Sequence, residues 1–565
     1  MMIKALNSVK NGEDNFMILQ INVPEEEETR QYVHWIFDVD YSGSMSARSI
    51  KDERTRLEHV QSTLVNILEY LKLHSVRTKS IHKVSIIWFN HLTNTSEAPT
   101  LTFEIDKGTD LSGFRDEIFK VMPNGSTSIS GAITAADTLI PQKIIYKTAL
   151  IFMSDGQPTA GNCSHYQLEN MVQKVIDRVE KDNSHSFSTM FIGYGAGETG
   201  LMEKLGNIGN GEYHCIESEE GAGVVYGEIT HNILAQQRKN TVIEVENGQI
   251  YDFKFNEWST SLNVGNMPNG SERVFHLKTT TPDTIKVTMK YADYKSDQGL
   301  WDNEEDVNTT IIEPEEGKIN EMVKIYKIRQ EVLELLSDAR AWKTENPYMA
   351  PINTPMMLRA PPLLAAPPPI KRQTNAPSAF NSNDMATLPP LPVTPPQPRI
   401  NKPHPNRVCS APTTGKAEKT PVESNDINVE LKSHYDMLKI KLEAKLSHVK
   451  TYIAELTSQN NEEYQKGIAV LQMLTDDLFI TIESLERPHG LTNIIARQTS
   501  QGTQRAYNTC NADDFNDTLS EHTVSDSYTS PYAAPSAAQC IRSISQPTTI
   551  GNCPSTVVSS PSSGN

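Results

Sequence analysis

Apolar strand-like runs alternate with helix-like stretches through the first part of the chain. Mostly apolar, strand-like runs occur at residues 33–37, 84–89, 148–153 and 186–192. Between the first two runs, apolar residues recur at intervals of three and four, for example at Leu57, Val60 and Leu64, which places them on one face of a helix. This alternation predicts an α/β fold over residues 31–238, with a mainly parallel sheet covered by helices on both faces.

The apolar pattern changes to a period of two between Thr241 and Ile312, which is typical of antiparallel strands. Asn-Gly pairs at 247–248 and 269–270 separate the runs. We therefore expect a β-sandwich-like domain over residues 239–315. Residues 15–23, within an N-terminal segment spanning 1–30, form another strand-like run. We expect this strand to join the β domain, so that the α/β unit is inserted into it.

The second half of the chain alternates between helical and low-complexity stretches. An amphipathic helix is predicted over 316–346 and a helical hairpin over 426–490, which packs on that helix or on a second copy of the chain. Between them, residues 350–421 hold eighteen of the 33 prolines and eight basic against two acidic residues, a net charge of +6. Residues 347–425 are therefore predicted to be a disordered linker, and the Ser- and Thr-rich stretch 491–565 a disordered tail.

Charge and cysteine content limit the partners and the cellular compartment that we expect. The 565-residue chain has a net charge of −18, which argues against nucleic acid as a partner. The six cysteines include no Cys-x-x-Cys pair, which indicates reduced thiols. The N-terminus lacks the apolar core of a signal peptide and no run reaches membrane-spanning length. We expect a cytoplasmic protein without a membrane span.

The first candidate site follows the strand-like run at 33–37. Asp40, Ser42 and Ser44 occupy alternate positions in the turn after that strand. One carboxylate and two hydroxyls make a hard oxygen set that suits Mg²⁺ better than zinc. The alternative is a polar turn in which a serine caps the next helix.

Two later segments add to this set. Thr127 lies in the first turn of a predicted helix, and Asp155 ends the apolar run at 148–153. Both positions lie where a strand or loop gives way to a helix, which is where open parallel sheets hold ligands. Asp40, Ser42, Ser44, Thr127 and Asp155 together resemble the Asp-x-Ser-x-Ser, Thr and Ser-Asp-Gly motifs of the von Willebrand factor type A (VWA) family with its metal-ion-dependent adhesion site (MIDAS). The resemblance covers roughly residues 31–238.

The resemblance implies a role for each residue. Ser42, Ser44 and Thr127 would ligate Mg²⁺ (or Mn²⁺ or Ca²⁺) directly, while Asp40 and Asp155 would act through water. Asp155 and Gly156 would form the rim of the site, where an Asp or Glu of a protein partner completes the coordination. The implied function is Mg²⁺-dependent adhesion or scaffolding, which needs no catalytic residue, and we expect no enzyme activity. A homodimer through the helical region is a further prediction.

Two other functions stay open. Helical VWA proteins include members linked to ubiquitin ligases, so the chain could be a substrate-binding scaffold of such an assembly, although it has no RING or U-box pattern. A metal-dependent phosphoester hydrolase would need a second acidic cluster or a base near Thr127, and only Asp38 offers itself. Asp38 lies on the same side of its strand as Asp40, so it is either an additional acid beneath the ion or a carboxylate paired with His34 or Lys147. We favour the pairing, and we expect Ser126 and Ser128 to cap a helix.

Overall fold

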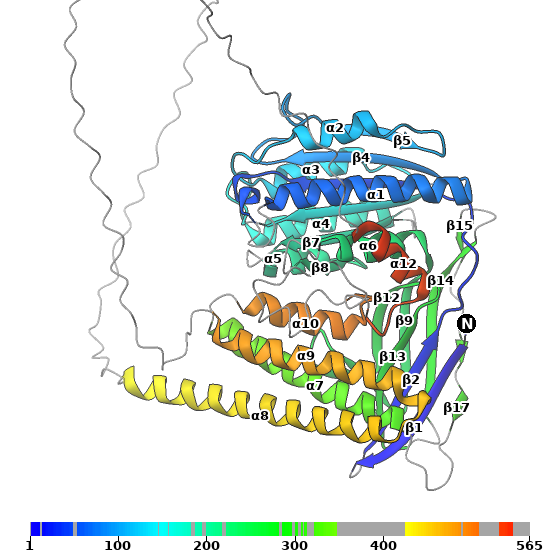
Figure 1. The fold of residues 1–565 in the computed structure, drawn as a ribbon, viewed down its shortest axis with the longest axis vertical. Helices are drawn as coiled ribbons and strands as arrows, with labels where there is room; N and C mark the ends of the chain where they lie inside the picture. Colours follow the sequence, from blue (N-terminus) through cyan, green and yellow to red (C-terminus); the bar gives the residue numbers. More distant parts are fainter. Residues whose placement is uncertain are drawn as a thin grey trace, which may run out of the picture. The chain divides into compact units, whose positions relative to one another are not determined.

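The computed structural model of the chain describes its helices, strands and most of their connections (Figure 1). The described residues are 2–11, 14–48, 54–144, 146–155, 157–181, 187–194, 199–216, 222–281, 285–295, 300–302, 307–308, 310–312, 321–346, 424–487, 490–507 and 530–545. The predicted linker at 347–425 lies outside this set except for its last two residues, which belong to a helix.

A six-stranded sheet forms the centre of the α/β unit. Its order is β5 (Leu101–Ile105), β4 (Ile81–Phe89), β3 (Tyr32–Asp40), β6 (Lys147–Ser154), β7 (Phe187–Tyr194) and β8 (Glu212–Ile216). All neighbouring pairs are parallel except β4 and β5. The mainly parallel sheet agrees with the alternation in the sequence, and β5 is the antiparallel edge strand.

Helices cover both faces of this sheet because its strands are apolar on both sides. One face packs against α1 (Arg56–Thr78), α2 (Ser112–Lys120), α6 (Ala222–Leu234) and α12 (Pro535–Ser545). The other packs against α3 (Ile129–Leu139), α4 (His165–Glu180), α5 (Thr199–Gly206) and α10 (Leu491–Thr503). Trp35 and Ile36, adjacent on β3, belong to the two different cores.

Two antiparallel-rich sheets make up the β region. The first has the order β11 (Glu257–Ser259), β10 (Gln249–Asp252), β13 (Glu272–Thr279), β2 (Asp14–Asn22), β1 (Met2–Asn11) and β17 (Thr310–Ile312). The second has the order β12 (Ser261–Pro268), β9 (Gln236–Glu246), β14 (Lys286–Lys295) and β15 (Leu300–Asp302), and β16 (Val307–Asn308) pairs with β14. Because β2 pairs with β13 over its whole length, the N-terminal strand joins the β region as expected.

The strand β2 is apolar on both sides for a physical reason. Met17, Leu19 and Ile21 point into the core between the two β sheets. Phe16 and Ile18 point the other way and pack against Tyr326 of α7 (Glu321–Glu345). The first sheet is therefore buried on both faces at β2, which explains why residues 16–19 form a continuous apolar run.

The helical region consists of α7, α8 (Ser424–Ser458) and α9 (Gln465–Glu486), and its core includes Leu336, Leu442 and Leu471. The turn between α8 and α9 contains Asn460 with a positive φ of 49° and Asn461, whose side chain accepts the backbone N–H of Glu463. This is the hairpin that the spacing of apolar residues predicted.

The prediction that residues 491–565 are disordered is wrong for two segments. α10 buries Ile494 and Ile495, and α12 buries Ile541 and Ile544. α12 contacts α6 closely at Gly227, where a Cβ would lie 2.6 Å from Ile541 Cα. These helices are short and rich in Ser, Thr and Ala, so their apolar positions are too sparse to stand out in the sequence.

No helix in the described part of the chain is both long and apolar enough to traverse a lipid bilayer.

Candidate functional site

Three loops meet at the carboxyl ends of β3, β4 and β6. The backbone N–H of Tyr41, just after Asp40, donates to Phe89 O at the end of β4 (2.9 Å). Gly43 N–H donates to Gly125 O in the loop before α3 (2.9 Å). Hydrogen bonds therefore hold the turn after β3 against the end of β4 and against the loop that carries Thr127.

The loop that carries Thr127 is held by its backbone. Gly125 has a φ of +79°, and a Cβ there would lie 2.6 Å from His91 Nδ1, so glycine is required. Thr127 N–H donates to Thr159 Oγ1 (2.9 Å), and its carbonyl accepts from the N–H groups of Thr159 and Ala160. The Thr127 side chain is 4% exposed and lies two residues from the Gly43–Gly125 contact.

Asp40 is buried and held by two hydrogen bonds. Its Oδ1 accepts from Ser42 N–H (2.8 Å), and its Oδ2 accepts from the Ser154 hydroxyl (2.6 Å). The pKa of Asp40 is raised to about 7, chiefly by burial and also by the charge of Asp155, against the lowering effect of the hydrogen bonds from Ser154 and Ser42. The carboxylate therefore gains from a nearby cation that favours its ionised form.

Ser42 and Ser44 link Asp40 to the end of β6. Their hydroxyl oxygens lie 3.0 Å apart, and Ser44 Oγ donates to Asp155 Oδ1 (2.7 Å). Ser42 is buried and Ser44 is exposed, so the cluster opens to solvent at Ser44. The structure thus brings Asp40, Ser42, Ser44 and Asp155 into one hydrogen-bonded chain. The loop that carries Thr127 is attached to the same turn by the Gly43–Gly125 hydrogen bond.

Arg56 is a member of the site that the sequence analysis missed. Its Nη1 lies 2.8 Å from Asp155 Oδ2, and the Arg56 side chain is 23% exposed. Arg56 is the first residue of α1, which begins with a capping box between Thr55 and Glu58. The capping box is visible in the sequence, but nothing local indicates that the arginine after the cap reaches a carboxylate 99 positions away.

The comparison with protein families agrees with this geometry. The family model of the von Willebrand factor type A domain matches residues 35–157, a stretch that contains all five predicted metal-site residues. Residues 35–157 form a VWA domain.

Solved structures resemble the chain at low identity. They include a von Willebrand factor type A protein from Catenulispora acidiphila (12% identity, 59% of this chain and 78% of that one, TM-score 0.38). The ArnB paralogue VWA2 from Sulfolobus acidocaldarius has 12% identity over 61% of this chain and 84% of its own, with a TM-score of 0.32. The pilus adhesin SpaC from Lactobacillus rhamnosus GG has 10% identity over 52% and 45%, with a TM-score of 0.29. No curated protein matches the chain significantly.

Asp38 departs from the expected pairing. We favoured His34 or Lys147 as its partner, but His34 Nε2 bonds to the Ser85 hydroxyl and Lys147 Nζ bonds to Gln31 Oε1. Both carboxyl oxygens of Asp38 are buried without a hydrogen-bond partner among the described residues. Burial raises the pKa of Asp38 well above its usual value, and the charge of Asp40 adds to the shift. The favoured pairing is therefore wrong, and Asp38 is an additional acid beneath the VWA site.

Two other predicted residues have separate outcomes. Ser128 caps α3, because its side chain accepts from Gly131 N–H, and this confirms its expected role. Gly156, predicted at the rim, lies outside the described residues.

The donor set of the VWA site fits a hard cation. It combines the oxygens of Asp40, Ser42, Ser44 and Asp155 with a buried threonine nearby, and it holds more carboxyl groups than positive charges. Clusters of three or more His, Cys, Asp or Glu able to hold a metal do not occur among the described residues, and this site draws three of its five members from Ser and Thr. Oxygen-rich sets of this kind favour Mg²⁺, Mn²⁺ or Ca²⁺ over zinc.

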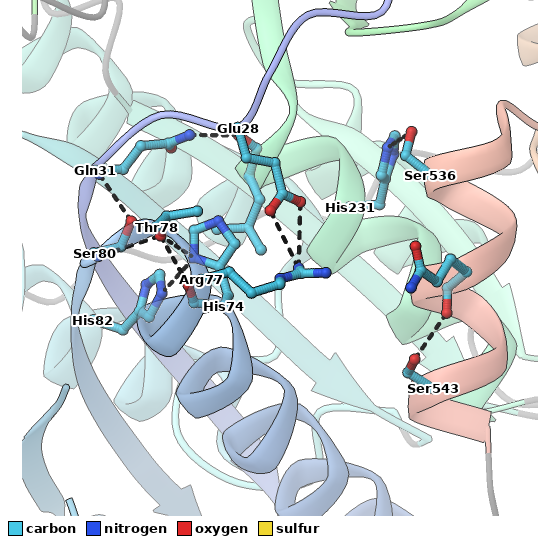
Figure 2. A network of polar contacts seen from close by, with 12 residues as sticks. Glu28, Gln31, His74, Arg77, Thr78, Ser80, His82, His231, Ser536 and Ser543 are labelled. Atoms are coloured by element: carbon cyan, nitrogen blue, oxygen red, sulfur yellow. Dashed lines mark hydrogen bonds and ion pairs between the residues drawn. The ribbon is translucent and has the colours of Figure 1, made fainter. Parts of the chain in front are cut away.

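A second polar cluster lies at the opposite, amino end of the same sheet (Figure 2). Trp35 Nε1–H donates to His82 Nδ1 (3.3 Å), so His82 carries its proton on Nε2 and donates it to His74 Nδ1 (3.0 Å). Burial lowers the pKa of His74 to about 4 and that of His82 to about 3, and neighbouring positive charges add to both shifts.

Other groups close this end of the sheet. Ser80 Oγ accepts from Gln31 N–H (2.9 Å) and bonds to the Thr78 hydroxyl (2.6 Å). Gln31 Oε1 accepts from Lys147 Nζ (3.0 Å), and burial lowers the pKa of Lys147 to about 7. The hydroxyls of this cluster bond to each other and to Gln31, and among the described residues no group of three or more His, Cys, Asp or Glu that could hold a metal lies here.

Proposed function

We propose that this protein binds a partner protein through a Mg²⁺ ion at the carboxyl end of the VWA sheet. When bound, the ion would supply an electrophilic centre with a position open to a carboxylate oxygen. Ser42, Ser44 and Thr127 would hold it directly, and Asp40 and Asp155 would orient its water ligands. The partner would contribute an Asp or Glu side chain.

The hydrogen-bonded chain from Asp40 through Ser42 and Ser44 to Asp155 is the observation that carries this proposal. It aligns hydroxyl and carboxyl oxygens from two strand ends beside an opening at Ser44. No covalent step is needed, because binding a carboxylate to a cation uses charge and coordination alone. A hydrolase is less well supported, since Asp38, the base it would require, is completely buried. The role of scaffold in a ubiquitin-ligase-like assembly remains a more specific version of the same binding function.

Cation binding can be measured first on the full chain. Isothermal titration calorimetry with MgCl₂ should detect binding by the wild type, and Mn²⁺ and Ca²⁺ can be compared in the same way. The Ser42→Ala/Ser44→Ala variant should lose it, because two direct ligands are removed. Ser46→Ala is a matched control, because Ser46 lies in the same turn but its hydroxyl donates to Gly43 O. Equal binding by the double variant and the wild type would refute the site.

Partner chemistry can be measured with a displayed peptide library selected on the immobilised chain in Mg²⁺ and eluted with EDTA. Selected peptides should share an Asp or Glu, and replacing that residue by Asn or Gln should abolish binding. Peptides that stay bound in EDTA, or that lack a common acidic residue, would contradict the proposal.

A further inference from the structure

Helix α8 has an inner face that packs on the rest of the protein. Leu442, Val449 and Leu456 recur every seven residues and are at most 1% exposed. They belong to the same apolar core as residues of α7 and α9. If Met437 is taken as position a of a heptad, these three residues occupy position f, which lies on the opposite side of the helix from positions a and d.

The opposite, outer face of α8 is also free of charge. Met437 and Ile440 are 53% and 64% exposed, which is unusual for large apolar side chains. The spacing of three and four continues from them along the helix. We call these residues the outer seam: Met437, Ile440, Ala444, Ser447, Thr451 and Ala454, all of which are exposed. The seam occupies successive a and d positions over three heptads, and small side chains in its second half allow another helix to approach closely.

Charged residues flank the outer seam in a complementary order. Position g holds Asp436, Glu443 and Lys450, and position e holds Lys441, His448 and Glu455. All six side chains are exposed. In a parallel pair of helices, each g residue meets the e residue five positions later on the other helix.

A second copy of α8 in parallel satisfies every one of these contacts. Asp436 would meet Lys441, and Lys450 would meet Glu455, which are opposite charges. Glu443 would meet His448, an imidazole that can donate to a carboxylate. An antiparallel copy with the same overlap would pair Glu443 with Lys450, but it would also place Lys441 opposite His448 and leave Asp436 without a basic residue opposite it.

Two lysines on the side of α8 nearer the rest of the protein form ion pairs within the chain. Lys439 pairs with Glu486, and Lys445 pairs with Glu331 (2.6 Å). These contacts fix α8 on the body and point away from the outer seam. Because the helix is already folded and anchored, docking a second copy does not require it to fold first.

We propose that the outer seam of α8 is a parallel self-association surface, where a second copy of the chain docks α8 against α8. This surface is separate from the VWA metal site, so it does not depend on Mg²⁺. It gives a specific location and orientation to the homodimer expected from the helical region.

Sedimentation velocity of the full chain in EDTA tests the association over a wide range of concentrations. We expect a monomer–dimer equilibrium whose dissociation constant rises about tenfold or more in Ile440→Lys, because each copy would bury a charge in the seam. Ile440 is exposed in the single chain, so its replacement should leave the fold intact, which circular dichroism checks. Met122→Lys is the control, since Met122 is 69% exposed in a loop of the VWA domain. A chain that stays monomeric throughout, or a dimer indifferent to Ile440→Lys, would overturn the proposal.

Orientation is tested by charge exchange and cross-linking. Lys441→Glu should weaken the dimer, and adding Asp436→Lys should restore it. Ser447→Cys should form a covalent dimer with itself under mild oxidation, beyond that of the unmodified chain, because d positions face each other in a parallel pair. If cross-linking instead requires mixing Ser447→Cys with Ala444→Cys chains, the pair is antiparallel and the proposed orientation is wrong.

Discussion

The two ends of the VWA sheet hold polar clusters of opposite design. At the amino end, buried histidines, hydroxyls and Lys147 bond mainly to one another and to backbone carbonyls, and burial shifts the pKa values of His74 and His82 toward the neutral form. At the carboxyl end, burial raises the pKa values of Asp38 and Asp40, and Asp155 pairs with the guanidinium of Arg56.

Because the two clusters differ in this way, we expect the amino-end cluster to contribute to stability and the carboxyl-end cluster to contribute to binding. The two clusters lie toward opposite ends of β3, whose nine residues span about 26 Å at about 3.3 Å per residue. The side chains of the amino end bond mainly within the protein, so this cluster should contribute to the stability of the fold. The carboxyl end has excess acid and an exposed hydroxyl, so a cation should complete it. Changes at one end should therefore leave the property of the other end unchanged.

Acidification should produce the largest effect, a loss of stability that arises from the histidines of the amino-end cluster. The folded pKa values of His74 and His82, about 4 and about 3, lie below the usual 6.5, so the unfolded chain takes up protons first. Their contribution to stability is intact above about pH 6.5 and falls as the pH drops toward 4. Each histidine should cost about 2 to 3 kcal/mol at pH 4.5. Urea denaturation at pH 7.5 and 4.5 measures this loss.

A paired variant isolates the two histidines from other buried ones. His74→Gln/His82→Gln should show a smaller difference in stability between the two pH values, because the groups that take up protons are gone. His434→Gln, an exposed position on α8, serves as control. An unchanged pH dependence in the paired variant would show that the closed amino end does not set acid stability.

Gln31→Ala should have the next largest effect on stability. Gln31 accepts from Lys147 Nζ and donates to Leu234 O (2.9 Å), so its loss leaves a buried ammonium and a carbonyl short of partners. We expect about 2 kcal/mol less stability in urea denaturation. Mg²⁺ binding by the folded variant should be unchanged. A weaker Mg²⁺ affinity would mean that the two ends are coupled, and Gln173→Ala on the exposed side of α4 is the control.

The same contrast explains what the sequence could predict. Alternating apolar runs predict the strands and their mainly parallel pairing, and local motifs place Asp40, Ser42, Ser44 and Asp155 at strand ends. These are short-range signals. Arg56 and the His74–His82 contact depend on how distant elements pack, which spacing alone does not encode. The unpartnered state of Asp38 could not be predicted either, since it depends on His34 and Lys147 bonding elsewhere.

Helices α10 and α12 show the same limit in the fold. Each has few apolar residues, so composition suggested disorder. Their stability comes from surfaces supplied by the α/β unit, such as the close approach of Ile541 to Gly227 on α6. Burial that depends on a distant surface leaves little trace in the local pattern.

Asp38→Val should stabilise the protein. This variant tests whether the buried carboxyl group at the carboxyl end of the sheet lowers the stability of the fold. Asp38 carries two unpartnered oxygens between Ile87 and Phe152 of the neighbouring strands. Replacing it with a β-branched apolar residue should raise the free energy of unfolding by about 1 to 2 kcal/mol at pH 7. Asp38→Asn keeps polar atoms at the same place and should gain less. A loss of stability in Asp38→Val would show that the acid is satisfied in solution.

Arg56→Gln should give the smallest effect, and on binding rather than stability. The guanidinium lies 2.8 Å from Asp155 Oδ2 and competes with a metal ion for the charge of that carboxylate. Its removal should raise Mg²⁺ affinity by roughly threefold to tenfold at low salt, and less at high salt, because the competing charge is partly screened. Arg178→Gln, which breaks the Arg178–Asp137 pair outside this site, controls for a general change in net charge. If Arg56→Gln instead weakens Mg²⁺ binding, the arginine orients Asp155 for the ion. Arg56 would then support the metal site rather than compete with the ion for the charge of Asp155.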